Sequence, residues 1–145
     1  MTADSPGMAL ALSGHIASTR IRKALARHGL KPAHGHVLRL LSDQGPTSQQ
    51  SLLETLGVDP SMLVTVLNDL EADGLVERRR DPADRRRHIV EISTRGRTLA
   101  GRAQAAIAAV EAALFAGLDA DEIATLRRLL ARVTASAGDV SCSED

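Results

Sequence analysis

Apolar residues recur three and four positions apart along most of the chain, a spacing typical of helices that bury one face. This spacing, together with capping residues and glycine stops, predicts helices over about residues 8–28, 32–44, 47–56, 60–73, 94–117 and 119–137. Two short segments, 75–78 and 88–92, are instead predicted as strands, separated by an arginine-rich loop of residues 79–87. The fold is therefore predicted to be mainly α-helical, with a small antiparallel β wing of two to three strands.

The segment from Asp59 to Asp73 is predicted as a capped helix with one buried face. Asp59 fits the N-cap, Pro60 fits the first helical position, and Gly74 ends the helix. Apolar residues at i, i+3, i+4 and i+7 predict a core face made of Leu63, Val66, Leu67 and Leu70. The outer side then consists of Ser61, Met62, Val64, Thr65, Asn68 and Asp69.

The preceding helix is predicted to begin with a capping box, because Thr47 is followed three residues later by Gln50. Gly57 closes this helix, and a short turn leads into helix 60–73. Two short helices joined by such a turn have the spacing of a helix-turn-helix, and a strand, basic loop and strand after them give the outline of a winged one. A second capping box, Asp119 with Glu122, is predicted at the start of the last helix.

Charge is unevenly distributed along a chain whose formal net charge is zero. Residues 76–97 contain eight arginines and four acidic residues, which gives this segment a net charge of +4. A polyanion such as DNA responds to the local basic patch and not to the net charge of the chain. With one phenylalanine and no tryptophan or tyrosine, the chain lacks the aromatic platforms on which single-stranded nucleic acids stack. The composition therefore favours a duplex over a single strand.

The helices predicted outside the winged segment have more apolar surface than that segment can cover. Helices 8–28, 94–117 and 119–137 are all amphipathic, with alanine-rich faces. We therefore expect these helices to pack on one another across the two-fold axis of a homodimer.

Cys142 is the only cysteine, and it lies in a polar segment, residues 138–145, that is predicted to be a disordered tail. We expect it to be an inert thiol in a reduced, intracellular setting. No apolar run approaches the length of a membrane span, and no export signal is visible at the N-terminus. A cytoplasmic protein without a membrane partner is therefore expected.

The wing carries the pattern DPADRR, residues 81–86, shortly after GLVER, residues 74–78. The other residues of the same pattern are Leu56-Gly57-Val58, Leu63, Leu67, Leu70-Glu71, Ile92-Ser93 and Gly96. This set closely resembles the MarR family of bacterial transcription regulators, and the wing pattern is its most specific part. The order of the flanking helices also fits, so the resemblance covers about residues 8–137.

The resemblance implies a single MarR-like domain over residues 1–145 that forms a triangular dimer on a pseudo-palindromic operator. It makes residues 8–28 and 94–137 dimerisation helices and residues 32–93 the winged helix-turn-helix that binds DNA. It further implies a repressor that small ligands or oxidation release. Two positions depart from the family pattern. Many relatives carry Thr-Arg where this chain has Val64-Thr65, and Phe115 is the only aromatic residue available to an effector pocket.

The capped helix is expected to enter the major groove, where each base pair exposes a distinct set of donors and acceptors. Asn68 is expected to pair with adenine, and Ser61 and Thr65 are expected to bond to bases or phosphates. Val64 and Met62 are expected to pack on thymine methyl groups.

The wing, residues 79–88, is expected to enter the minor groove, where arginine meets an enhanced negative potential. Arg85, Arg86 and Arg87 follow a tight turn, and the family resemblance makes Arg86 the inserted side chain. The resemblance also implies that Asp84 holds the guanidinium of Arg86 by a charge-assisted pair. Three residues at the start of the preceding helix are expected to contact phosphates through exposed N–H groups and hydroxyls, namely Thr47, Ser48 and Gln49.

Two other functions stay open at this stage. A metal-responsive regulator is possible through His28 with His34, or through His15 across a dimer interface, although His34 and His36 point to nearly opposite sides of a helix. A winged protein-interaction module without DNA binding is open because helix 60–73 has no basic residue. Neither enzymatic activity nor a cofactor is expected, because the chain has no G-x-S-x-G, P-loop or G-x-G-x-x-G pattern.

Overall fold

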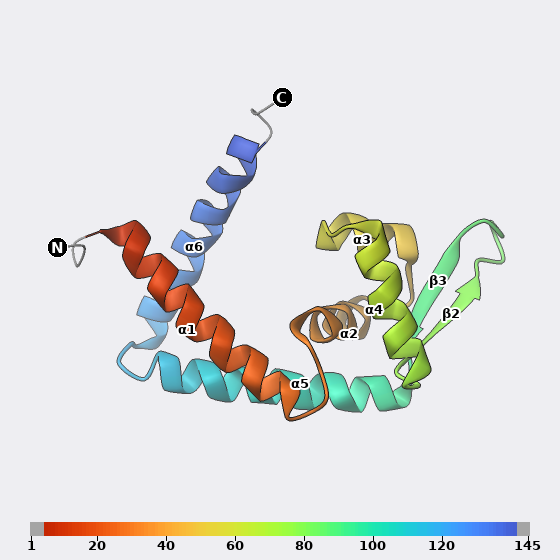
Figure 1. The fold of residues 1–145 in the computed structure, drawn as a ribbon, viewed down its shortest axis with the longest axis horizontal. Coiled ribbons are helices and arrows are strands. Elements are labelled where there is room, and N and C mark those ends of the chain that lie inside the picture. Colours follow the sequence, from red (N-terminus) through yellow and green to blue (C-terminus); the bar gives the residue numbers. More distant parts are fainter. Residues whose placement is uncertain (1–4, 142–145) are drawn as a thin grey trace. The chain divides into compact units, whose positions relative to one another are not determined.

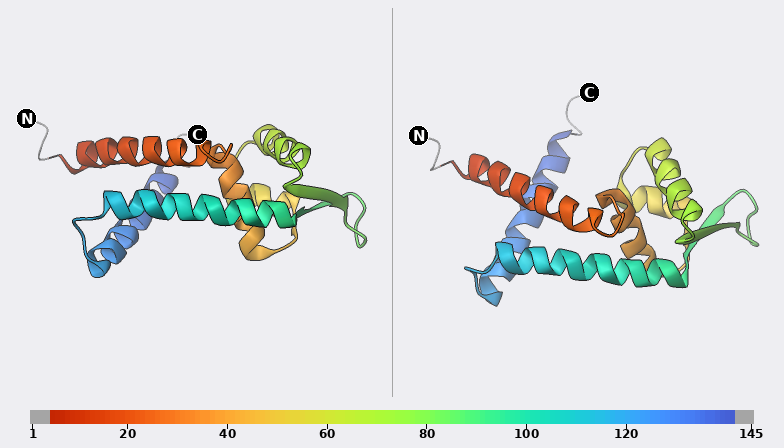
Figure 2. Two further views of the ribbon diagram at one scale, coloured as in Figure 1. Left: turned by 90° about the horizontal axis from the view of Figure 1, so that it is seen from below. Right: turned by 60° about the horizontal axis from the view of Figure 1, so that its bottom comes forward.

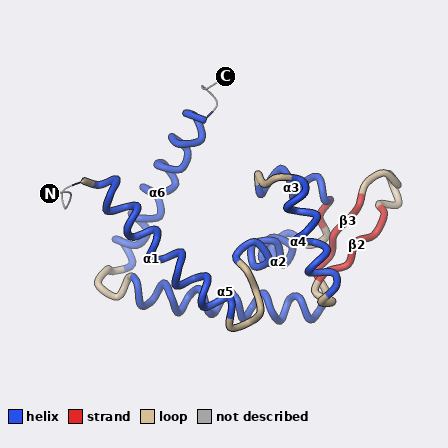
Figure 3. The backbone as a smooth tube through the Cα atoms, viewed as in Figure 1, coloured by secondary structure: helices blue, strands red, loops and turns tan. Residues whose placement is uncertain are grey.

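A computed structural model of the protein describes residues 5–141, with side-chain exposure for residues 5–137. Its elements in chain order are α1 (Pro6–Ala26), α2 (Pro32–Gln44), β1 (Thr47–Ser48), α3 (Gln49–Leu56), α4 (Pro60–Ala72), β2 (Val76–Arg80), β3 (His88–Ile92), α5 (Thr94–Leu114) and α6 (Ala120–Ser141). Figure 1 follows these elements along the chain, and Figure 3 separates helices from strands and loops. The predicted helical fold with a small antiparallel sheet is confirmed.

The chain divides into two compact units between Val110 and Glu111, within α5. The winged unit runs from α1 to residue 110, and the C-terminal unit holds the end of α5 and α6. Across residues 5–141, no helix is both long and apolar enough to cross a bilayer.

In the core of the winged unit, α2 and α4 contribute more buried residues than the other helices, and they pack against each other and against the sheet. The buried apolar residues of these two helices are Val37, Leu38, Leu41, Leu63, Val66, Leu67 and Leu70. The face of α4 that the helical spacing predicts is therefore confirmed. Each fully buried leucine or valine contributes about 1.5–3 kcal/mol relative to exposure. The buried stripe thus fixes which side of α4 is left for solvent.

The sheet has three antiparallel strands in the order β1-β3-β2. β2 and β3 pair along their whole lengths and form the hairpin that projects beyond α3 and α4 in Figure 2. Val76, Val90 and Ile92 are buried, whereas Glu77 and Arg79 are exposed, because successive side chains of a strand point to opposite faces. The hairpin is therefore anchored in the core at its root, and its tip is exposed.

The third strand, β1, changes the start of the helix-turn-helix. Thr47 and Ser48 pair with β3, so the predicted capping box of Thr47 with Gln50 is wrong. Ser48 is the N-cap, and its Oγ accepts the N–H of Ser51 at 3.0 Å. Thr47 has an extended backbone that pairs with β3. The Thr47 hydroxyl donates to the carbonyl of Gly45 at 2.8 Å.

At the root of the wing, the end of α4 and the start of α5 are held together by hydrogen bonds and close packing. Gly74 adopts a φ of 71°, a left-handed conformation that favours glycine. The Ser93 hydroxyl donates to the carbonyl of Gly74 at 2.7 Å and accepts the N–H of Gly96 at 3.0 Å. The Ser93 N–H donates to the carbonyl of Leu75 at 2.9 Å. A Cβ on Gly96 would lie 2.2 Å from that carbonyl oxygen, so this joint admits only glycine.

The C-terminal unit consists of the end of α5, a turn and α6. Asp119 and Glu122 form the predicted capping box, with reciprocal bonds of 3.0 and 2.9 Å between backbone N–H groups and carboxylates. α6 continues to Ser141, past the predicted end near residue 137. The rest of the predicted disordered tail, with Cys142, lies outside the described residues. None of residues 111–137 is buried.

Candidate nucleic-acid interface

α4 presents one side to the core and the opposite side to solvent. The Asp59 carboxylate accepts the N–H of Ser61 at 2.8 Å and its hydroxyl at 2.6 Å, which confirms the predicted N-cap. These bonds, above all the one from the Ser61 hydroxyl, hold the pKa of Asp59 below its ordinary value of 3.8. The helix therefore begins at a fixed point, and its exposed outer side is centred on Ser61, Val64, Thr65 and Asn68.

The hydroxyl groups on this outer side already donate hydrogen bonds, one to the N-cap residue and one to the helix backbone. Ser61 donates to Asp59, and Thr65 Oγ1 donates to the carbonyl of Ser61 at 3.0 Å. Both hydroxyls therefore present lone pairs to solvent and act there as acceptors. Met62 and Val64 are 47% and 39% exposed, so apolar surface borders these acceptors.

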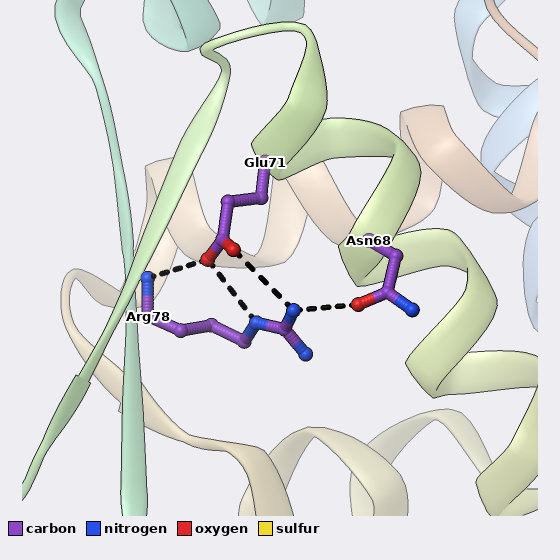
Figure 4. A network of polar contacts seen from close by, with 3 residues as sticks. All are labelled: Asn68, Glu71 and Arg78. Atoms are coloured by element: carbon purple, nitrogen blue, oxygen red, sulfur yellow. Dashed lines mark hydrogen bonds and ion pairs between the residues drawn. The ribbon is translucent and has the colours of Figure 1, made fainter.

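Asn68 takes part in a polar network with Glu71 and Arg78 (Figure 4). Its Oδ1 accepts a hydrogen bond from Nη2 of Arg78. Glu71 in turn accepts bonds from the Nε, the Nη2 and the backbone N–H of Arg78, at 3.2, 3.4 and 3.2 Å. These bonds favour the carboxylate and hold the pKa of Glu71 below its ordinary value of 4.5. Of the Asn68 amide, Nδ2 is left for a ligand, whereas Oδ1 already accepts the Arg78 bond and would have to share this acceptor in a pairing with adenine through both ends of the amide.

The tip of the wing is a closed loop between β2 and β3. The Asp81 N–H donates to the carbonyl of Arg87, and the Arg87 N–H donates to the carbonyl of Asp84, both at 2.9 Å. Nη1 of Arg80 spans the loop and donates to the carbonyl of Arg85 at 2.9 Å. The loop therefore has a defined shape before any ligand binds.

Asp84 does not hold the guanidinium of Arg86, so this expectation is wrong. Its Oδ1 accepts the backbone N–H of Arg86 at 3.1 Å, and its Oδ2 lies 3.9 Å from Nε of Arg87. The tight turn over residues 84–87 brings positions i and i+3 together, so the pair forms one residue later than predicted. Within residues 5–141, the guanidinium groups of Arg85 and Arg86 have no ion-pair partner.

A recess of about 380 Å³ lies between α3, α4 and the wing. The predicted DNA contacts that it brings together are Ser48, Gln49, Val64, Arg86 and Arg87. The other predicted contacts, which are not part of its lining, are Thr47, Ser61, Met62, Thr65, Asn68, Asp84 and Arg85. Gln50, Pro60 and His88 also line it and were not predicted. Their position next to predicted contacts in the sequence is the only signal that could have found them.

His34 links the start of α2 to α4. Its Nδ1 accepts the N–H of Lys31 at 3.2 Å, and its Nε2 lies 3.1 Å from Oδ2 of Asp69. Both ring nitrogens therefore have protein partners, and the Asp69 carboxylate is paired with His34. In the part of the chain that the structure describes, no group of three or more histidine, cysteine, aspartate or glutamate side chains could hold a metal ion.

The MarR family model matches residues 30–88, from the turn before α2 to the start of β3. These residues include α3, α4 and the wing loop, the elements that form the recess.

Solved structures extend the similarity to nearly the whole chain. A MarR-family transcriptional regulator from Rhodococcus sp. RHA1 is 30% identical, with 92% of this chain and 94% of that chain covered and a TM-score of 0.80. CouR from Rhodococcus jostii RHA1, solved with p-coumaroyl-CoA, has the same identity, coverage and TM-score. A mutant of MarR from E. coli, solved with operator DNA, is 26% identical, with 88% and 91% covered and a TM-score of 0.77.

Proposed function

Because this chain belongs to the MarR family of transcriptional regulators, we propose that it is a repressor that binds double-stranded operator DNA as a homodimer. The operator is pseudo-palindromic, and each half-site meets one winged unit. α4 lies in the major groove, and the wing over residues 79–88 lies in the minor groove. The protein acts in the cytoplasm and is not an enzyme.

The observation that carries the proposal is that two arginines of the wing, close to α4, lack an ion-pair partner among the described residues. The guanidinium groups of Arg85 and Arg86 have no ion-pair partner in the described residues, and Arg86 shares the recess with Val64 of α4. Phosphates supply the charge that such arginines lack. Because the wing loop is already closed by backbone hydrogen bonds, little ordering entropy opposes binding.

The proposed contacts divide by chemistry among the three elements. They are Thr47, Ser48 and Gln49 to phosphates, Ser61, Met62, Val64, Thr65 and Asn68 to the major groove, and Asp84, Arg85, Arg86 and Arg87 at the wing. The lone pairs of Ser61 and Thr65 suit the amino groups of cytosine and adenine better than they suit phosphates, because phosphates offer no donor.

Each unit also leaves apolar side chains in water, which supports the homodimer. The exposed large apolar residues of α1 and α6 are Met8, Leu10, Leu12, Ile16, Leu129, Leu130 and Val133. Burial of apolar surface contributes about 25 cal/mol per Å², so faces of this kind favour association. We place the subunit contacts on these terminal helices.

A small-molecule effector completes the proposal. CouR was solved with p-coumaroyl-CoA, and by analogy a small molecule releases this chain from DNA.

Substituting Arg86→Ala tests the DNA contact. We expect affinity for duplexes selected from a random library to fall by about 1–3 kcal/mol, the range for one good groove contact. Arg102→Ala is the matched control, because Arg102 is an exposed arginine of α5 that is not among the proposed DNA contacts. Fluorescence anisotropy at several salt concentrations measures both, and the slope against log salt should fall for Arg86→Ala alone.

Equal affinities of parent and Arg86→Ala would refute the wing contact. A chain that ignores duplex DNA at low salt would favour the protein-interaction module. The selected duplexes should contain two inverted half-sites about 10 base pairs apart, and the protein should sediment as a dimer.

A further inference from the structure

Arg78 reaches α4 because of its place on β2. Side chains of β2 alternate between the two faces of the sheet, and Arg78 follows buried Val76 on the face that packs on α4. Its side chain is 22% exposed, whereas that of its neighbour Arg79, on the other face, is 50% exposed. The guanidinium of Arg78 is therefore held against the helix and is not a free cation like those of the wing.

Glu71 fixes the orientation of this guanidinium. It accepts the Nε and Nη2 of Arg78 and also its backbone N–H. Two side-chain bonds from one planar fork set the plane of the guanidinium as well as its position. The remaining hydrogen of Nη2 then points to Asn68 (Figure 4).

The chemistry of the two groups decides which end of the Asn68 amide faces Arg78. A guanidinium has donors and no acceptor, so only the carbonyl oxygen of an amide can pair with it. A flipped amide would place its NH₂ against Nη2 and leave two donors facing each other. The end of the Asn68 amide that faces away from Arg78 is its NH₂ group, which is a pure hydrogen-bond donor (Figure 4).

We propose that Asn68 reads DNA mainly as a donor, through Nδ2, and that Arg78 is the positioning residue that sets this polarity. The proposal rests on the proposed function, because it assumes that α4 lies in the major groove. A donor fits bases whose major-groove edge offers acceptors without an amino group, namely guanine with O6 and N7 or thymine with O4. It is less suited to the bidentate pairing with adenine, because Oδ1 would then have to accept from the adenine amino group and from Arg78 at the same time.

Selection from a random duplex library, with the purified full-length protein, tests this polarity. We expect one position in each half-site to be guanine or thymine and to lose preference in Asn68→Ala, which identifies it as the Asn68 position. Replacing that base by adenine should lower affinity about five- to tenfold, the low end for a base contact. Adenine as the selected base at that position would overturn the proposal.

Asn68→Asp reverses the polarity with little change of shape. One carboxylate oxygen can stay on Arg78, and the other then offers an acceptor to the groove. We expect the same position to switch to cytosine or adenine, whose edges carry an amino donor. Affinity falls for all sequences because the new charge repels phosphates, so the ratio between bases is the measure. An unchanged guanine or thymine preference would overturn the proposal.

Arg78→Met frees the amide and tests the positioning role. We expect discrimination between guanine or thymine and adenine to shrink to about equal affinity, while the other positions keep their preferences. Arg79→Met is the matched control, since it removes the same charge one residue away on the opposite face, and it should leave the position unchanged. A preference retained in Arg78→Met would overturn the role of Arg78, and Asn68→Asp gives the answer should Arg78→Met fail to fold.

Failure of the proposed function itself would give a different experimental result. In that case no duplex is enriched even with the parent protein, whereas failure of the inference alone leaves enriched inverted half-sites with the wrong base or an insensitive position.

Discussion

The winged unit and the C-terminal unit use similar amphipathic helices but bury them very differently. In the winged unit, Leu38 and Leu67 have no exposed surface. In the C-terminal unit, no residue among 111–137 is buried, and Leu129 and Leu130 of α6 are 45% and 38% exposed. Residue types alone do not separate the two units, because both are rich in leucine and alanine.

The difference lies in what covers each apolar stripe. The stripe of α4 packs on α2 and the sheet, whereas α6 has only the end of α5 within its own unit. Most of the stability of a helix in a protein comes from tertiary packing of one face. The winged unit is therefore expected to hold its own fold, and the C-terminal unit is expected to depend on a second subunit.

We expect Gly96→Ala to give the largest loss of stability, and this loss should fall on the winged unit. Its Cβ would lie 2.2 Å from the carbonyl oxygen of Leu75 and 2.7 Å from Cγ1 of Ile92. Because a backbone atom has to move, we expect a loss of about 4 kcal/mol or more in the free energy of unfolding. Urea denaturation followed by circular dichroism measures it.

Gly101→Ala on the same helix is the control. Nothing lies within 4 Å of its added Cβ, and alanine is the better helix former by about 0.8–1 kcal/mol. We expect this variant to be slightly more stable than the parent. A similar loss in both variants would show that α5 tolerates neither change and that the close contact at Gly96 is not the cause.

The next largest effect should come from truncating one leucine in each unit, because the loss of stability should differ between the two units. Leu67→Ala opens a cavity in the core of the winged unit, and we expect it to lower the free energy of unfolding by about 3 kcal/mol. Leu130→Ala removes an exposed side chain, so we expect the unfolding of the winged unit to change by less than about 0.5 kcal/mol. Sedimentation should instead detect a weaker dimer. A dimer that Leu130→Ala leaves unchanged would contradict the proposed role of this face of α6.

Acidification should have the smallest effect on stability, and this effect should come from the ion pair between Glu71 of α4 and Arg78 of β2. The pKa of Glu71 is lowered by Arg78 in the folded protein, so its contribution is complete above about pH 4.5 and is lost as pH falls through the lowered pKa. We expect Glu71→Gln to be less stable than the parent at neutral pH and equal to it in strong acid, as measured by thermal melting across that range.

Glu77→Gln is the control for this titration. Glu77 lies opposite Glu91 in the register of β2 and β3, and like charges in that position repel each other. Its removal should therefore not destabilise the protein at neutral pH. A loss equal to that of Glu71→Gln would mean that net charge, and not the Arg78 link, is responsible.

Features that depend on neighbouring residues could be predicted from the sequence. The cap at Asp59, the capping box at Asp119 and the buried stripe of α4 each involve residues within one or two helical turns. Helical spacing and capping chemistry act over that range, so local patterns suffice.

Features that depend on distant partners could not be predicted. The local pattern predicts Thr47 as a helix cap, but Thr47 pairs with β3 as part of a strand. Asp84 pairs with Arg87 and not with Arg86, because the turn geometry and not the charge pattern selects the partner. The orientation of the Asn68 amide depends on a bond from Arg78, which returns to α4 only after the turn at Gly74. In each case the deciding contact is set by tertiary packing.

The joint at the root of the wing has a mechanical consequence. Ser93 bonds to the carbonyl of Gly74, and Gly96 packs closely on the backbone of Leu75, so little hinge motion is expected between the end of α4 and the first turn of α5. A force that tilts the start of α5 is therefore expected to turn α4 and the wing together with it. In the proposed homodimer, such a rotation would change the distance between the two winged helix-turn-helix regions and leave the shape of each unaltered.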